Sequence, residues 1–177
     1  LDAIKQISPQ TWMIPLATSS EWLLLHRLFR SDSLGPLSEC AATPTSGEII
    51  FNSSTRPYMT GDASYDLILR GGHIQRYEVV EKAKQGEPEY LKTAAYLRNA
   101  HPDSKAFAFK KPRIVYQEGS AIDAWRRVIP TYLPEGNICG HKICYFVDYK
   151  VHMMAFLAVF GSTLTNWLVE KLSVTNS

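Results

Sequence analysis

Short β-type runs dominate the middle of the chain and constrain its fold more than any other feature. Each run is rich in β-branched or aromatic residues, and turn residues separate the runs at irregular intervals. No internal repeat relates them, so the pattern favours one irregular β-rich body over a repeat array. The expected strands span residues 48–51, 65–70, 76–80, 113–117, 128–133 and 143–147.

Helical spacing appears on both sides of these runs. Residues 18–20 offer a cap for a helix over 21–30, and acidic residues around a proline open a second expected helix over 87–99. Apolar spacing over 151–172, interrupted by Gly-Ser at 161–162, predicts two shorter helices arranged as a hairpin. The pattern therefore predicts an α+β fold in which an irregular β-rich body is followed by a C-terminal helical hairpin.

The size and composition predict one globular domain. The chain has 177 residues, of which 45% are hydrophobic and 20% are charged, so a single domain over residues 1–177 is expected. Cys40, Cys139 and Cys144 lack C-x-x-C spacing, which favours neither a disulfide framework nor a zinc cage and indicates a reducing, cytoplasmic compartment. The most apolar run, at 153–169, is too short for a membrane span, so no membrane partner is expected. The first residues lack an initiator Met and a signal peptide, which indicates a fragment of a longer chain.

The net charge of +2 conceals a basic central segment. Residues 98–127 hold seven basic and three acidic residues, whereas residues 1–66 hold four basic and seven acidic ones. Tyr116 and Trp125 are interleaved with the basic residues, a pattern typical of a surface that faces phosphates. The alternative is a solvated edge that binds no ligand.

Motifs for catalysis and cofactor binding are missing from the sequence. The only glycine pair, Gly71-Gly72, has neither a G-x-G-x-x-G pattern nor a Walker lysine around it, and no G-x-S-x-G elbow occurs. The histidines are scattered without H-x-x-x-H spacing, so no metal site is expected. Glu78, Glu81 and Lys82 only loosely match the paired acidic residues and lysine that a metal-dependent nuclease uses. We therefore expect no catalytic residue, metal ligand or cofactor in this chain.

Four stretches carry a family resemblance, in the order 34–52, 67–79, 110–119 and 152–176. The segment L-R-G-G-H-I-Q-R-Y in the second stretch is similar at every fixed position to the pattern L-R-G-x-x-I-x-R-Y. The third stretch contains K-P-R-I-V-Y-Q-E, and the fourth resembles a helical pair followed by S-x-T-N, with V-F-G-S where L-N-S is usual. Together they resemble the TaqI-like C-terminal specificity domain. This is the target-recognition domain of type IIG restriction–modification enzymes and related adenine-specific DNA methyltransferases.

The resemblance implies both a function and a partner. Members of the family recognise a specific sequence in double-stranded DNA and direct a methyltransferase or restriction endonuclease to it. Upstream they carry a Rossmann-type methyltransferase domain with an S-adenosylmethionine loop and an N-P-P-Y motif, and neither motif occurs here. The resemblance thus implies a recognition fragment of a bacterial enzyme, with double-stranded DNA and the parent methyltransferase domain as partners. S-adenosylmethionine and Mg²⁺ would belong to the parent enzyme.

The glycine pair and the arginines around it are one candidate DNA contact. In a target-recognition domain, basic side chains hold phosphates while a few polar side chains read base edges. Arg70 and Arg76 flank the glycine pair, and a bend there would let the backbone approach a phosphate closely. The alternative is a buried arginine pair that braces the turn through Asp66 or Glu78.

The third stretch is the other candidate contact. Lys110 and Lys111 are expected to hold phosphates, and they precede a strand whose alternation places Arg113 and Gln117 on one face. Gln117 and Gln75 have the amide groups that pair bidentately with adenine. The predicted DNA-binding residues are Arg70, His73, Gln75, Arg76, Lys110, Lys111, Arg113 and Gln117.

Two other functions stay open on the sequence. The helices expected over 151–172 could dock a partner subunit without direct DNA contact, and an exposed apolar helix face would favour this protein-interaction module. A small metal-dependent nuclease would instead require a cluster of carboxylates around a divalent ion.

Overall fold

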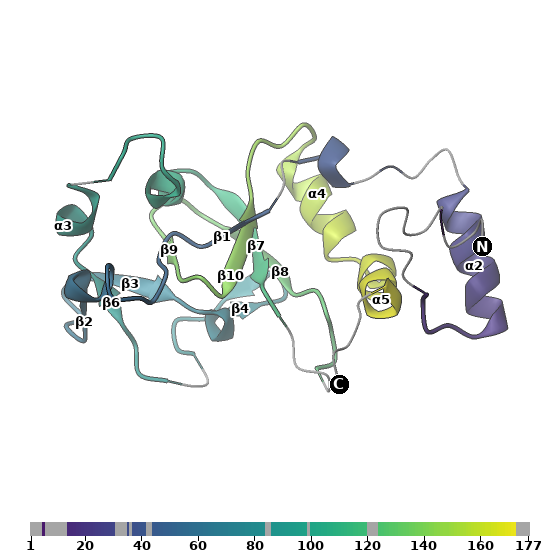
Figure 1. Cartoon of the computed structure of the whole chain (residues 1–177), viewed down its shortest axis with the longest axis horizontal. Helices are drawn as coiled ribbons and strands as arrows, with labels where there is room; N and C mark the ends of the chain where they lie inside the picture. Colours follow the sequence, from purple (N-terminus) through teal and green to yellow (C-terminus); the bar gives the residue numbers. More distant parts are fainter. Residues whose placement is uncertain are drawn as a thin grey trace.

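A four-stranded antiparallel sheet forms the centre of the molecule (Figure 1). Val115 lies in a middle strand, opposite Tyr145 on one side and Thr131 on the other. The computed structural model describes residue 5 and residues 14–30, 35, 37–41, 44–83, 86–98, 100–119 and 124–172. In sheet order the strands are β1 (Thr45–Ser46), β10 (Ile143–Phe146), β7 (Arg113–Gln117) and β8 (Pro130–Leu133).

A second, mixed sheet and a small hairpin complete the β-rich body. In the second sheet β3 pairs antiparallel with β6 and parallel with β9. The hairpin of β4 and β5 lies against β8, where the Tyr77 N–H donates to the Pro130 carbonyl at 3.0 Å. These strands are β2 (Met59–Thr60), β3 (Asp66–Leu69), β4 (Ile74–Gln75), β5 (Glu78–Val79), β6 (Tyr90–Leu91) and β9 (Ile138–Cys139).

Helices lie at the two ends of the molecule (Figure 1). The short helix α3 lies beside β2 and β6, while α4, α5 and α2 lie at the opposite end, where α4 and α5 meet at a bend of 55°. Among the described residues no single helix is long and apolar enough to cross a membrane, although the bent pair reaches that length and composition together. The α-helices are α2 (Ser19–Phe29), α3 (Thr93–Leu97), α4 (Met153–Phe160) and α5 (Thr163–Leu172), and the 3₁₀ turns are η1 (Leu37–Glu39), η2 (Arg56–Tyr58), η3 (Gly71–His73) and η4 (Lys105–Lys110).

Alternate side chains of β7 point to opposite faces of the central sheet and pack into two different hydrophobic clusters. Ile114 packs into an aromatic cluster with Phe146, Phe156 and Phe160, which fixes α4 on one face of the central sheet. Val115 faces the opposite layer, which lies between the central sheet, β3 and β4. The structure therefore confirms the α+β fold with a C-terminal pair of helices.

Three element predictions need correction. The expected helix over 87–99 is reduced to α3, because residues 90–91 pair as β6 between β2 and β3. The expected strand over 48–51 keeps only an isolated bridge at Ile49, and the regular strand lies earlier, at β1. The expected strand over 76–80 begins at Glu78, because Tyr77 adopts a positive φ of 64° and forms the hairpin turn.

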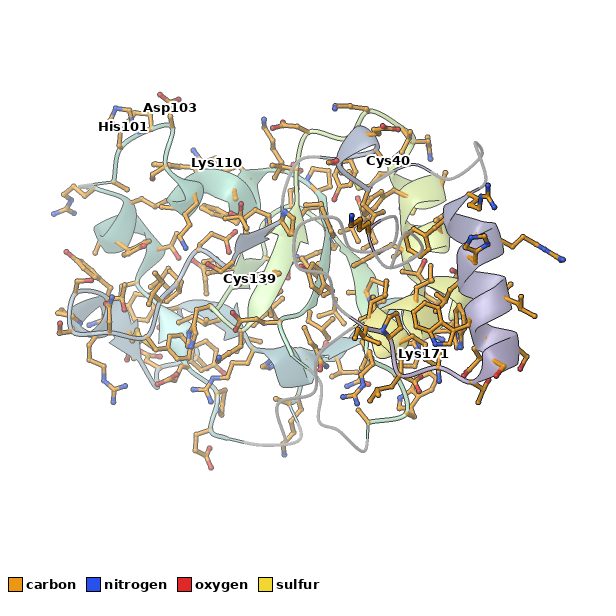
Figure 2. The ribbon with its side chains drawn as sticks, turned by 45° about the vertical axis from the view of Figure 1, so that its right-hand side comes forward. Cys40, His101, Asp103, Lys110, Cys139 and Lys171 are labelled. Atoms are coloured by element: carbon orange, nitrogen blue, oxygen red, sulfur yellow. The ribbon has the colours of Figure 1, made fainter. Side chains whose placement is uncertain are left out.

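Helix α2 is attached to α5 by one carboxylate. Thr18 and Glu21 form a capping box at the start of α2, and Lys171 Nζ lies 2.8 Å from Glu21 Oε1. Figure 2 labels Lys171 on the yellow helix α5. The bond from Lys171, together with those from Thr18, lowers the pKa of Glu21 from 4.5 to about 2. A lowered carboxyl pKa contributes stability that is present above the unfolded value and is lost as the pH falls through the folded value.

We therefore expect the contact between α2 and α5 to weaken between pH 4.5 and about 2. Glu21→Gln should remove this pH dependence, because the amide does not titrate in that range. Amide exchange of α2 as a function of pH measures the effect, and Glu170→Gln, an exposed change on α5, is the control. Equal pH dependence in wild type and Glu21→Gln would show that another group controls the contact.

Candidate nucleic-acid interface

The predicted turn arginine Arg70 is held by an acidic partner. Its guanidinium pairs with Glu89 and lies over Phe51, 5.4 Å from the ring centroid. Glu89 precedes β6 in the chain, and the expected partners Asp66 and Glu78 are not the ones that the structure uses. The Arg70 side chain is 31% exposed, so it braces the turn and still reaches the surface.

Arg76 reaches away from the glycine pair to the corner between α4 and α5. Its Nη2 donates to the Gly161 carbonyl at 3.1 Å, and its guanidinium lies 4.8 Å from the centroid of the Tyr77 ring. The Tyr77 hydroxyl donates to the same carbonyl at 3.3 Å, and the buried Arg126 donates to it at 2.8 Å. Because Gly161 is the C-cap of α4, Arg76 braces the α4–α5 corner and not the glycine turn, and the two partly exposed arginines do not form the buried pair of the alternative.

His73 is buried inside the glycine turn. Its Nδ1 accepts a hydrogen bond from the Arg70 N–H at 2.9 Å, and its carbonyl accepts one from the Val80 N–H at 2.9 Å. Burial lowers the pKa of His73, which favours the neutral imidazole that can act as this acceptor. The residue is 3% exposed, so in this conformation it shapes the turn and offers no surface to DNA.

Arg113 forms a buried ion pair. Its Nη2 lies 2.5 Å from Glu48 Oε1, and each of the two side chains is 1% exposed. The same guanidinium donates to the carbonyls of Ala108 and Asn137, both at 2.9 Å. Glu48 Oε2 in turn accepts the Cys139 N–H at 2.9 Å. Arg113 therefore joins β7 to the segments around it and lies beyond the reach of a phosphate.

The two predicted glutamines differ in their freedom to move. Gln117 Nε2 donates to the Ile74 carbonyl at 2.8 Å, which ties the end of β7 to β4. Gln75 makes only a long contact of 3.5 Å with the Gly72 carbonyl. Both are partly exposed, so a base can approach either, but bidentate pairing at Gln117 would first require its bond to Ile74 to break.

Lys110 and Lys111 are exposed but lie apart from the glycine turn. Lys110 Nζ lies over the Phe107 ring, 4.7 Å from its centroid. Figure 2 places Lys110 on the upper side of the molecule, whereas Figure 1 places β4, which carries Gln75, on the lower side. The two views share the vertical axis, so the predicted residues do not form one continuous surface.

Two adjoining hollows surround the glycine turn. They have volumes of about 590 and 290 Å³ and share Gly71 and Lys142 in their walls. The turn between β9 and β10 borders both hollows, and its Lys142 carbonyl accepts the Glu118 N–H at 3.0 Å. We call this surface the glycine-turn face. It comprises Phe51, Arg70, Gly71, Gly72, Gln117, Glu118, Gly119, Gly140, His141 and Lys142.

The sequence analysis missed His141 and Lys142. Both lie in the short turn between β9 and β10, which the Gly140 N–H ties to the Leu69 carbonyl at 2.8 Å. The only local signal was a glycine followed by two residues with basic side chains, and nothing in the sequence placed it beside the glycine pair.

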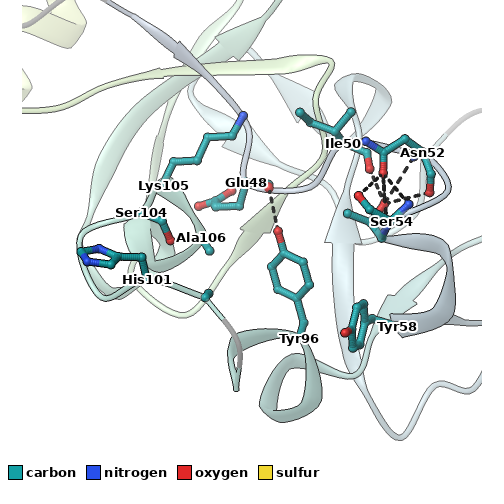
Figure 3. A pocket seen from close by; sticks show the side chains of 12 residues that line it. Glu48, Ile50, Asn52, Ser54, Tyr58, Tyr96, His101, Ser104, Lys105 and Ala106 are labelled. Atoms are coloured by element: carbon teal, nitrogen blue, oxygen red, sulfur yellow. Dashed lines mark hydrogen bonds between the residues drawn. The ribbon is translucent and has the colours of Figure 1, made fainter.

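A separate pocket of about 380 Å³ lies between the segment 48–58, α3 and η4 (Figure 3). Tyr96 donates from its hydroxyl to the Glu48 carbonyl at 3.4 Å, and His101 and Lys105 lie on the opposite wall. None of the predicted DNA-binding residues lines this pocket, so it is not part of the candidate interface.

The side chains considered for metal binding or nucleophilic chemistry are spread over the described residues. No three His, Cys, Asp or Glu side chains among the described residues are placed to hold a metal ion, and Glu78 and Glu81 are exposed. The cysteines are free, and burial raises the pKa of Cys139 to about 12, which keeps that thiol protonated.

Comparisons with known proteins do not assign a family. No protein-family model matches the chain, and no curated protein matches it. The resemblance to target-recognition domains therefore depends on the motifs quoted above. Of these, the S-x-T-N segment at 173–176 lies outside the described residues.

Proposed function

We propose that this chain is a double-stranded DNA-recognition domain that directs a DNA methyltransferase or restriction endonuclease to its target sequence. One observation carries the proposal. The segment that resembles L-R-G-x-x-I-x-R-Y folds into a turn whose glycines share two surface hollows with Arg70, Gln117, His141 and Lys142. This combination brings cations, an amide side chain and exposed backbone to one place.

The roles of these groups follow from their exposure. Lys142 is 68% exposed and Arg70 reaches the surface, so both can contact phosphates. Gly72 and Gly119 carry no side chain that would hold a DNA backbone away from the protein. Gln75 and Gln117 supply the amide groups suited to adenine edges in the major groove. His73 shapes the turn from within the fold, whereas Arg76 and Arg113 are engaged at the α4–α5 corner and in the core.

Catalysis in this proposal belongs to the parent enzyme. The upstream methyltransferase domain would bind S-adenosylmethionine, Mg²⁺ would serve a nuclease domain, and the recognition domain would only position the DNA. The partners are accordingly double-stranded DNA and the parent methyltransferase domain, in the cytoplasm of a bacterium.

Lys142→Ala tests the assigned surface. It should weaken binding to every duplex by a similar factor and reduce the salt slope by about one, because it removes one phosphate contact. The side chain is exposed, and its ion-pair partner among the described residues is Glu118 at 3.1 Å, so the free energy of unfolding should change by less than about 0.5 kcal/mol. Fluorescence anisotropy with a labelled duplex at several salt concentrations measures both quantities.

The matched control is Lys110→Ala combined with Lys111→Ala, on the other side of the molecule. This double variant should weaken binding less than Lys142→Ala does. A larger loss in the double variant would move the DNA surface to the basic segment. Binding that does not depend on salt, or that is absent at low salt, would contradict DNA recognition itself.

A second candidate function, docking of a partner without DNA contact, is favoured by exposed apolar side chains on the helices. Val159 of α4 is 61% exposed, and Met154, Leu164 and Leu23 are also exposed. For a docking module, duplex DNA should fail to bind at low salt, while substitution of Val159 by a charged residue should leave the fold intact.

A further inference from the structure

The smaller hollow of the glycine-turn face has an unusual lining. Its volume is about 290 Å³, and its walls are Phe51, Arg70, Gly71, Gly140, His141 and Lys142. Arg70 and Lys142 carry positive charge, His141 adds an imidazole ring, and none of the described residues that line the hollow is acidic. Such a lining favours an anionic ligand.

Two polar atoms of this lining lack partners. Arg70 Nε and His141 Nδ1 are buried, and neither has a hydrogen-bond partner among the described residues. Both atoms have almost no exposed surface, so a ligand in the hollow would contact the exposed parts of Arg70, His141 and Lys142 instead. An oxyanion accepts hydrogen bonds and would suit the guanidinium, imidazole and ammonium donors of these side chains.

Phe51 holds the two side chains in fixed positions. The Arg70 guanidinium lies 5.4 Å from the centroid of the Phe51 ring, and the His141 ring packs edge-to-face against Phe51 at 5.1 Å. Gly140 makes this packing feasible, because an added Cβ would lie 3.3 Å from the Phe51 ring and 3.2 Å from the Leu69 carbonyl. The hollow is therefore organised before any ligand enters.

The neighbouring carboxylates do not cancel the positive charge. Glu89 is shared between Arg70 and Arg56, with Arg56 Nη1 at 3.6 Å, so that group of three keeps one net positive charge. Lys142 pairs with Glu118 at the exposed surface, where an ion pair is weak and a stronger anion displaces it readily.

We propose that this hollow binds one phosphate group through Arg70, His141 and Lys142. Arginine supplies several N–H donors in fixed geometry, and imidazole and ammonium groups complete a charge-assisted set for phosphate oxygens. The assignment of this phosphate to the backbone of duplex DNA rests on the proposed function, whereas binding of the phosphate group itself does not.

Titration of the isotopically labelled chain with inorganic phosphate, followed by amide NMR, tests the site. The amides of Gly71, Gly140 and His141 should shift and saturate. His141→Phe keeps a ring against Phe51 but removes both nitrogens, and Lys142→Gln keeps the length of the side chain but removes its charge. Each should weaken phosphate binding by about three- to tenfold, the loss expected for one charge-assisted hydrogen bond near the surface. His101→Phe, an exposed histidine elsewhere, should have no effect.

The outcomes separate the site from the proposed function. Absence of saturable shifts, or shifts centred on Lys110 and Lys111, would overturn the site. Wild-type phosphate affinity in Lys142→Gln would also overturn it, even if His141→Phe fails to fold. Phosphate binding without duplex binding would leave the site standing and remove the proposed function. A duplex affinity that is unchanged in both variants would keep the function and overturn the assignment of the site to the DNA backbone.

Discussion

Arg113→Met should lower the free energy of unfolding by about 3–5 kcal/mol, because it leaves the carboxylate of Glu48 buried without its partner. Methionine fills part of the same space, so the loss comes mainly from the unpaired charge and from carbonyls that lose their donor. Such a loss is a large fraction of the stability of an ordinary domain. Urea unfolding measures the effect.

The pH dependence of this deficit identifies its cause. Burial raises the pKa of Glu48, and Arg113 opposes that rise in the wild type. Without Arg113 the folded protein should hold a proton on Glu48 to higher pH. A raised carboxyl pKa means that stability falls as the pH rises from the unfolded value, about 4.3, through the folded one. The deficit of Arg113→Met should therefore be small at acidic pH and grow toward neutrality.

Two variants control the experiment. Arg113→Met combined with Glu48→Gln should be more stable than the sum of the single changes predicts, because no unpaired charge remains. Lys111→Ala, an exposed change two residues away, should alter stability by less than about 0.5 kcal/mol. If Arg113→Met unfolds like the wild type but loses affinity for DNA, Arg113 belongs to the interface and not to the core.

Sequence patterns predicted the helices and strands that are determined by residues near one another in the chain. Alternation in the segment 113–117 gave the bounds of β7, and the Thr18 cap and the apolar spacing over 151–172 located α2, α4 and α5. The helix predicted over 87–99 was wrong in its first part. Acidic residues around a proline favour a helix start, but pairing with β2 and β3 makes residues 90–91 a strand. That pairing is a tertiary effect, and a local pattern does not contain it.

The candidate site was harder to predict because a basic residue in a sequence does not reveal its partner. Arg113 finds Glu48, which lies 65 residues earlier, and Arg126 finds carbonyls at the α4–α5 break. Two members of the basic segment are thus buried, so its charge overstated the exposed positive surface. His141 and Lys142 reach the glycine pair only because β9 runs parallel to β3, a long-range pairing.

The corner between α4 and α5 gives the second large expected effect. The buried Arg126 donates from Nη2 to the carbonyls of Gly161 and Ser162, at 2.8 and 2.9 Å. Arg126→Ala should lower the free energy of unfolding by about 2–3 kcal/mol, because hydrogen bonds from a charged donor are lost and carbonyls are left without it. Arg76→Ala should cost less, about 1 kcal/mol, because Arg126 still satisfies the Gly161 carbonyl.

A double-mutant cycle tests whether the two arginines act on one carbonyl. Burial and the positive charge of Arg76 lower the pKa of Arg126, so the two groups repel each other while they share an acceptor. The double variant should therefore deviate from additivity, because the second substitution leaves the Gly161 carbonyl with only the longer 3.3 Å bond from the Tyr77 hydroxyl among the described donors. Gly161→Ala is an independent probe, since its Cβ would lie 2.7 Å from the Tyr77 hydroxyl and displace that ring. Urea unfolding gives the free energies, and amide exchange of α5 reports the corner directly. Additive losses would show that the two arginines stabilise the corner independently and would contradict the shared-acceptor model. An Arg76→Ala variant with wild-type stability and no DNA binding would assign Arg76 to the DNA site and leave the corner to Arg126 alone.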